Sequence, residues 1–218
     1  MTAGALKIRV EGIVQDASFS GGILALFNRC LGSIAARCAK ENKILPGLQA
    51  EETVTATAAA NKVALPANYS RGLFFVSSAA QKNRVKIQTN FTTYLRRWPD
   101  PARNQAGYIK DVAVSGGYLH YQPCADDTLT LHFFKKPPIL AAPADVVTCI
   151  DDHLQESLLV NFACREIYNV KEDGMEGGKT NTKTYDSLYN SALAELLEQL
   201  EHGTEEPVYI EDAEGYES

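Results

Sequence analysis

The first long amphipathic pattern in the chain begins after Ser18. Apolar residues recur there at steps of four, four, three and four positions, which places them on one face of an α-helix. These residues are Ile23, Phe27, Leu31, Ile34 and Cys38. The preceding stretch, Leu6 to Val14, also fits helical spacing, although Ile8 and Val10 alternate with charged residues as in a strand. We interpret it as a short helix, so residues 1–50 are predicted to form a helix pair.

The apolar period changes from 3.6 to 2 in residues 51–142, where β-branched and aromatic residues are bounded by Gly, Pro, Asn and Asp. This predicts an antiparallel β region. Gly116 and Gly117 accept the positive φ of a tight turn and predict a hairpin. Its strands are Tyr108 to Val114 and Tyr118 to Gln122. Further strands are predicted at Thr53 to Thr57 and Lys62 to Leu65, which flank a short turn. Leu73 to Ser77 and Arg84 to Gln88 are predicted to form another pair. A last strand is predicted at Thr128 to Lys136, where Leu129, Leu131 and Phe133 share one face.

Helical spacing returns in residues 143–203. Asp145 is suited to cap a new helix, since a carboxylate accepts hydrogen bonds from free backbone N–H groups. The expected inner face of that helix consists of Ile150, Leu154, Leu158, Phe162 and Ile167. A loop and a last helix follow, which ends at His202 and Gly203 and carries a stripe of Tyr185, Leu188, Ala192, Leu196 and Leu200. Each apolar face needs a partner, so the two helix pairs are predicted to pack together.

The predicted fold is therefore α+β: a four-helix bundle built from the N- and C-terminal helix pairs, with an inserted antiparallel β region. Residues 204–218 lack periodicity and are rich in acidic residues, so we expect a disordered acidic extension.

Charge is distributed unevenly along the 218 residues. Ten of the 27 acidic residues follow Lys183, the last basic residue, so the rest of the chain has 17 acidic and 21 basic residues. Such an acidic end suits a basic partner surface. No stretch approaches the roughly 20 apolar residues of a membrane-spanning helix. Lys7 and Arg9 interrupt the N-terminal apolar stretch, so no secretory signal is expected and the chain should stay in the cytoplasm where it is made.

Motifs that carry chemistry are weak throughout. Gly174 to Thr180 ends like a phosphate-binding loop, but its first glycine is replaced by Asp173 and a helix precedes it, so we interpret it as an inter-helix loop. Asp151, Asp152 and His153 point in different directions on a helix. His120 and His132, on adjacent predicted strands, lack an identifiable third metal ligand. Asp126 and Asp127 are typical turn formers. The five cysteines include no C-x-x-C pair and are expected to be buried thiols. We therefore predict no enzyme activity, no cofactor and no metal.

The densest basic and aromatic cluster surrounds Trp98 and contains Arg96, Arg97 and Arg103. Arginine and tryptophan can contact nucleic acid, and both are also enriched at protein interfaces. The acidic balance of the whole chain favours a protein interface.

Several segments, taken in order, resemble the head-to-tail adaptor (connector) proteins of tailed bacteriophages. They are the N-terminal helix pair, Leu65 to Tyr69, Tyr94 to Pro101, Gly117 to Pro123, Thr128 to Pro138 with its paired prolines, and the closing helix pair. The resemblance spans Leu6 to Leu200 and rests on the order of these segments.

The resemblance implies a noncatalytic virion protein located in the phage neck. Such proteins form a homo-oligomeric ring, typically twelve-fold, beneath the portal protein, and DNA passes through the lumen without sequence recognition. A downstream tail or nozzle protein binds the other side, and no membrane is involved. In this chain the extension is the expected portal-binding segment, through Glu205, Glu206, Pro207, Val208, Tyr209, Ile210, Glu211 and Asp212.

Three alternatives remain open from the sequence. The first is a stopper or tail-completion protein of the neck. The second is a soluble ligand-binding module that uses Tyr118, Tyr121 and Trp98. The third is a nucleotide-dependent assembly factor built on Gly178, Lys179 and Thr180.

Overall fold

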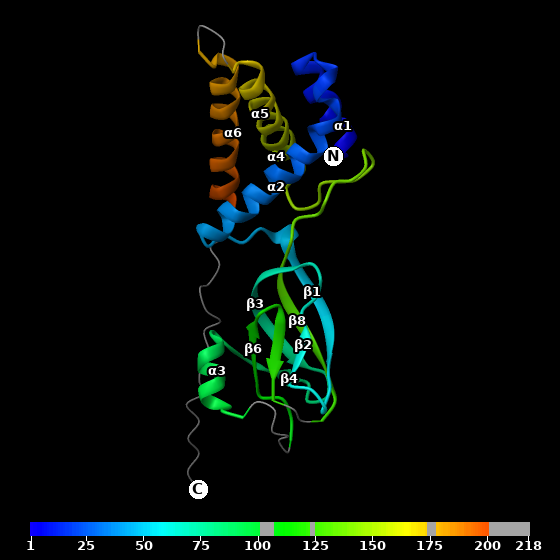
Figure 1. Ribbon diagram of the computed structural model, residues 1–218, viewed down its shortest axis with the longest axis vertical. Coiled ribbons are helices and arrows are strands. Elements are labelled where there is room, and N and C mark those ends of the chain that lie inside the picture. Colours follow the sequence, from blue (N-terminus) through cyan, green and yellow to red (C-terminus); the bar gives the residue numbers. More distant parts are fainter. Residues whose placement is uncertain (101–106, 123–124, 174–177, 201–218) are drawn as a thin grey trace. The chain divides into compact units, whose positions relative to one another are not determined.

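The computed structural model describes residues 1–100, 107–122, 125–173 and 178–200 (Figure 1). Internal contacts divide the chain into two compact units. We call Met1–Leu48 together with Pro137–Gly203 the helical unit, and Gln49–Lys136 the β unit. Each unit has its own cluster of buried apolar residues.

The helical unit begins with the two predicted helices, and both predictions are confirmed. Its elements are α1 (Ala3–Val14), the 3-10 turn η1 (Ala17–Gly22), α2 (Ile23–Lys40), the 3-10 turn η2 (Pro46–Leu48), α4 (Asp152–Gln155), the π-helical turn η3 (Glu156–Val160), α5 (Asn161–Lys171) and α6 (Thr180–Gln199). The Thr2 hydroxyl accepts a hydrogen bond from the backbone N–H of Ala5 and caps α1. Helix α2 buries all five predicted residues and also Cys30.

The segment Ala17–Lys40 is long and apolar enough to cross a membrane by length and composition, contrary to the sequence expectation. A core helix of a soluble protein passes the same test. The buried residues of α2 lie on one face at helical spacing, and the helix also carries Arg29 and Arg37, which form ion pairs with Glu166 and Glu41. This pattern is typical of an amphipathic core helix.

The middle helix runs through α4, η3 and α5 without a break, and its predicted inner face is confirmed except that Ile150 lies before the first helical residue. Ile150, Leu154, Leu158, Phe162 and Ile167 are all buried. The predicted start of this helix is wrong.

Asp145 caps no helix, because its carboxylate accepts hydrogen bonds from the backbone N–H groups of Ala141 and Ala142 and closes a turn. The helix begins only at Asp152. The predicted stripe of α6 is shifted in one place: Leu188 is 48% exposed, and Tyr189 is buried instead.

The β unit consists of two four-stranded sheets, with strand orders β1-β8-β3-β4 and β2-β7-β6-β5. The strands are β1 (Gln49–Ala56), β2 (Lys62–Ala64), β3 (Tyr69–Ser78), β4 (Asn83–Arg84), β5 (Lys86–Gln88), β6 (Asp111–Ser115), β7 (Tyr118–Tyr121) and β8 (Asp127–Lys135), and helix α3 (Phe91–Arg97) follows β5. The inward side chains of both sheets, among them Val112, Leu119 and Leu131, form one buried cluster.

The predicted hairpin is confirmed. Strands β6 and β7 pair antiparallel through Gly116 and Gly117, whose φ angles are 58° and 81°. The buried face of β8 is also confirmed, since Leu129, Leu131 and Phe133 are fully buried. The runs on either side of Ala59–Asn61 do not pair with each other, because β1 pairs with β8 and β2 pairs with β7.

The predicted architecture is wrong in two respects, although the mixed α and β composition holds. The helices do not form a simple four-helix bundle: α5 packs against α1, α2 and α6, and α2 runs obliquely across the other helices (Figure 1). The β region is not wholly antiparallel, since β5 and β6 pair in parallel. Parallel neighbours need a long crossover connection, and α3 lies within it. The predicted disordered extension lies outside the described residues.

Candidate functional site

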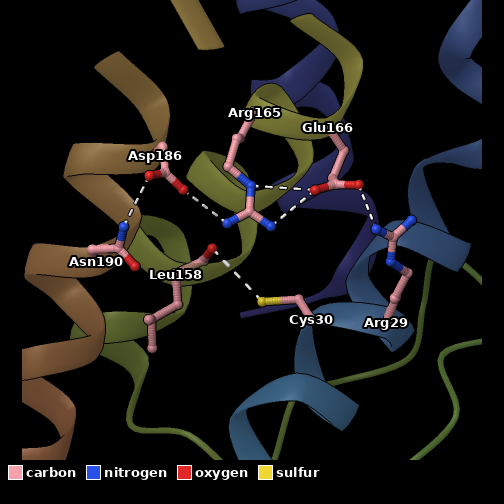
Figure 2. Close-up of polar contacts among 7 residues, drawn as sticks. All are labelled: Arg29, Cys30, Leu158, Arg165, Glu166, Asp186 and Asn190. Atoms are coloured by element: carbon pink, nitrogen blue, oxygen red, sulfur yellow. Dashed lines mark hydrogen bonds and ion pairs between the residues drawn. The ribbon is translucent and has the colours of Figure 1, made fainter. Parts of the chain in front are cut away.

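A network of charged side chains joins three helices of the helical unit (Figure 2). Glu166 on α5 accepts hydrogen bonds from Arg29 on α2 at 2.5 Å and from Arg165 Nη2 at 2.8 Å. Arg165 also donates to Asp186 on α6 at 3.0 Å. Charge-assisted hydrogen bonds of this kind are stronger than neutral ones. The network therefore fixes α2, α5 and α6 relative to one another.

Arg165 is the centre of this network. Its guanidinium lies over the rings of Phe162 and Tyr189, at 4.6 and 5.1 Å from their centroids. Burial lowers the pKa of Arg165, but its hydrogen bonds and charge contacts with Glu166 and Asp186 outweigh burial and raise this pKa. These side chains are used to hold helices together, which is a structural role.

The start of α6 binds an internal carboxylate. Glu172 accepts hydrogen bonds from the backbone N–H groups of Asn181 and Thr182 at 2.9 and 3.0 Å, and from both of their side chains. These hydrogen bonds, chiefly the one from the backbone N–H of Thr182, lower the pKa of Glu172 to about 2, although burial alone would raise it. A helix N-terminus attracts anions, and here the chain itself supplies one.

The nucleotide-dependent alternative is not supported by this geometry. Lys179 donates to Asn169 Oδ1 at 2.7 Å and forms an ion pair with Asp173 at 3.3 Å. Residues 174–177 of the motif lie outside the described residues. With Glu172 at the first turn of α6, nothing here favours the nucleotide-dependent alternative.

The predicted cluster around Trp98 is divided by the structure. Asp111, only 1% exposed, accepts hydrogen bonds from Gln88 at 2.6 Å and Trp98 Nε1 at 3.3 Å, and forms an ion pair with Arg97 at 3.1 Å. Arg97 and Trp98 therefore attach the end of α3 to strand β6. Arg96 is exposed, and Arg103 lies outside the described residues. Their role at an interface stays a prediction.

The two histidines occupy different sheets, so their prediction as neighbours on adjacent strands is wrong. His120 lies on β7 and its ring contacts Phe91 at 4.5 Å, whereas His132 lies on β8 beside Glu51. Burial lowers the pKa of His120. No group of three or more potential metal ligands occurs among the described residues. Tyr121 is buried and bonded to Thr57, so the surface of the ligand-binding alternative is incomplete.

The aspartates and cysteines have ordinary structural positions. Asp126 accepts a hydrogen bond from the N–H of Ala58, and Asp127 accepts one from the Ser78 hydroxyl. Asp152 forms an ion pair with the N-terminal amino group at 2.8 Å. The four cysteines that the structure describes, Cys30, Cys38, Cys149 and Cys164, are buried thiols, as predicted.

Two helix surfaces of the helical unit face outward on either side of α5 (Figure 1). The α1 outer face consists of Ala5, Ile8, Arg9, Gly12 and Ile13, and the α6 outer face consists of Thr184, Ser187, Leu188, Ser191 and Glu195. Ile8 is 69% exposed and Leu188 is 48% exposed. Helix α1 has two basic residues and one acidic residue, whereas α6 has three acidic residues and one basic residue.

A third surface lies on the outward face of the sheet β1-β8-β3-β4 and was missed by sequence reasoning. A row of contacting side chains runs across it, which we call the aromatic–arginine row: Arg71, Phe134, Phe74, His132, Phe75 and Arg84. The signal in the sequence was the combination of Arg71, Phe74 and Phe75 in Tyr69–Gln88, a segment that contains no acidic residue.

The predicted portal-binding residues, Glu205 to Asp212, lie outside the described residues, and their role stays a prediction. The described polar clusters connect elements of the fold, and the exposed surfaces combine apolar and charged residues. These features are typical of a protein whose polar clusters support its fold and whose surfaces are suited to association.

Comparison with known protein families agrees with this class. The family model described as SU10 adaptor protein matches residues 1–209. The chain therefore belongs to the SU10 adaptor protein family, the structural adaptors of a phage neck. A comparison with curated proteins gives no match.

Proposed function

We propose that the chain is a head-to-tail adaptor that forms a homo-oligomeric ring beneath the portal protein, with DNA passing through the lumen without sequence recognition. The family match over residues 1–209 carries this proposal. A downstream tail or nozzle protein binds the opposite side, and the ring is twelve-fold. The protein has no catalytic role in this function, and its place is the virion neck.

Ring formation requires two different surfaces on each subunit, because a head-to-tail contact repeats around a closed ring. The α1 and α6 outer faces meet this requirement. They lie on either side of α5, each exposes an apolar residue, and their helices have charge of opposite sign. We propose that the α1 outer face of one subunit packs against the α6 outer face of the next.

Portal attachment is assigned to the acidic extension. Pro207, Val208, Tyr209 and Ile210 are its only apolar run, and Glu205, Glu206, Glu211 and Asp212 flank this run. Such a segment can bind as an added strand or an ordered peptide, with its carboxylates beside basic portal residues.

Three variants separate these roles. Ile8→Glu and Leu188→Glu should each prevent ring closure while single chains still bind the portal, because only the lateral contact is disrupted. Val170→Glu, at a 62% exposed position of α5, is the matched control and should assemble normally. Deletion of residues 204–218 should instead abolish portal attachment and leave the fold intact. Attachment that survives this deletion would refute the assignment of the extension.

A further inference from the structure

The aromatic–arginine row is built by cross-strand pairing. Strand register places Phe75 opposite His132, and Ser77 opposite both Thr130 and Arg84, so these side chains share the outward face. Leu129, Leu131 and Phe133 alternate with them and are fully buried on the inner face. The row therefore belongs to the surface of the β unit.

Neighbouring side chains of the row contact one another through their rings. The ring centroid of Phe74 lies 5.4 Å from that of Phe134 and 6.2 Å from that of His132, and the centroids of Phe75 and His132 are 5.2 Å apart. The guanidinium of Arg71 lies 4.9 Å from the Phe134 centroid, and that of Arg84 lies 5.4 Å from the Phe75 centroid. Cation–π contacts of this length hold each guanidinium in place.

Gly72 makes the close approach at one end of the row possible. Its φ is +60°, which favours glycine, and a Cβ there would lie 2.9 Å from the Phe134 ring. The register of β3 against β8 also shifts between Arg71 and Phe75, as at a β-bulge. Bulges redirect side chains, so this one is suited to place Arg71 on the ring.

The two segments that carry the row are basic. Tyr69–Gln88 contains Arg71, Lys82, Arg84 and Lys86, and residues 128–136 add Lys135 and Lys136, with no acidic residue in either segment. Glu51 on the neighbouring strand β1 lies beside His132 at 3.8 Å. Because guanidinium groups cover two of the rings, the surface presents cations for carboxylates more than bare ring faces for base stacking.

We propose that the aromatic–arginine row is the docking site for the acidic C-terminal segment of the same chain, residues 204–218. This segment has six acidic and no basic residues and contains the apolar run Pro207 to Ile210, so it matches the row in charge and in apolar character. A tethered peptide has an effective concentration in the millimolar range, which favours its own chain over a free partner.

In this proposal the row and the portal compete for residues 204–218. The segment lies on the β unit while the portal is absent, and portal binding must displace it. The contact with the row does not depend on the portal role of the segment, so the two proposals can fail separately.

Binding of a fluorescent peptide of residues 204–218 tests the contact in the full chain. The recipient is a variant whose own segment is neutralised at Glu205, Glu206, Glu211 and Asp212 by the corresponding amides. We expect this variant to bind the peptide at least tenfold more tightly than the unmodified chain, whose site is already occupied. No binding, or equal affinity for both chains, would overturn the proposal.

Substitutions in the neutralised variant locate the site. Arg71→Gln with Arg84→Gln should weaken peptide binding at least tenfold, whereas the matched control, Arg37→Gln with Lys40→Gln on α2, should change it less than twofold. Arg71→Lys with Arg84→Lys keeps the charge and should retain affinity within threefold, which separates a loss of charge from a folding defect. Equal losses in the Gln pair and the control would mean nonspecific attraction and contradict the proposal. Tighter binding of a single-stranded 15-nucleotide DNA, with the same dependence on Arg71 and Arg84, would assign the surface to nucleic acid instead.

Discussion

The two units use arginine in different ways. In the helical unit, Arg165 lies between Glu166 and Asp186 and joins elements of the fold. On the outward face of the β unit, Arg71 and Arg84 lie over Phe134 and Phe75, on strands whose one acidic residue is Asp127 at the start of β8. The first arrangement supports the fold, whereas we propose that the second serves recognition.

The largest effect should come from removing an aromatic side chain from each core. Phe27 in the helical unit and Phe133 in the β unit are both fully buried. Replacement of either by Ala should lower the free energy of unfolding by about 3–5 kcal/mol. Because each residue belongs to a separate apolar cluster, hydrogen exchange should increase only in the unit that carries the change. Equal loss of protection in both units would show that they unfold together.

Asp111→Ala should have the next largest effect. It leaves Gln88 and the Trp98 indole without their acceptor and removes the partner of Arg97. We expect a loss of about 2–3 kcal/mol in the free energy of unfolding, measured by urea titration, with greater exposure of Trp98 fluorescence to quenchers. Lys110→Ala, at the neighbouring position, is the control, and a similar loss there would argue against a specific role of Asp111.

Replacement of an arginine should destabilise the helical unit more than the β unit. Arg165→Met should cost about 2 kcal/mol, because Glu166 and Asp186 lose charged hydrogen bonds. Arg71→Gln should change the free energy of unfolding by no more than about 0.5 kcal/mol, as is usual for surface substitutions. Thermal or urea unfolding of both variants measures the difference. If Arg71→Gln is as destabilising as Arg165→Met, the proposed contrast between the two units is wrong.

The smallest effect concerns the pH dependence of the helical unit. The pKa of Glu172 is lowered from its ordinary 4.5 to about 2, so its ionised form stabilises the fold. This stability is fully present above the unfolded pKa and is lost as pH falls from about 4.5 toward 2. Glu172→Gln should reduce the decline of the urea midpoint across this pH window. An unchanged decline would mean that Glu172 is not its source.

The sequence predicted the elements whose periodicity is local. The faces of α2 and the middle helix, the Gly116–Gly117 hairpin and the inner face of β8 follow from residues near one another in the chain. The helix cap predicted at Asp145 was wrong because a carboxylate satisfies a turn as readily as a helix start.

Other features depend on contacts between distant residues. The parallel pairing of β5 with β6, and the separation of His120 from His132, are set by sheet order, which strand periodicity does not specify. The aromatic–arginine row likewise requires the register of β3 against β8. Arg97 and Trp98 were identified as notable residues, but their common partner, the buried Asp111, could not be found without the fold.

The central claim is that the chain is an adaptor that assembles on the portal, and mass measurement of a mixture of the two purified proteins tests it most directly. Increasing amounts of the chain should convert portal rings into one discrete heavier species that contains one adaptor ring of fixed copy number. If the portal mass does not change at saturating chain concentration, the protein does not act as a portal-binding adaptor.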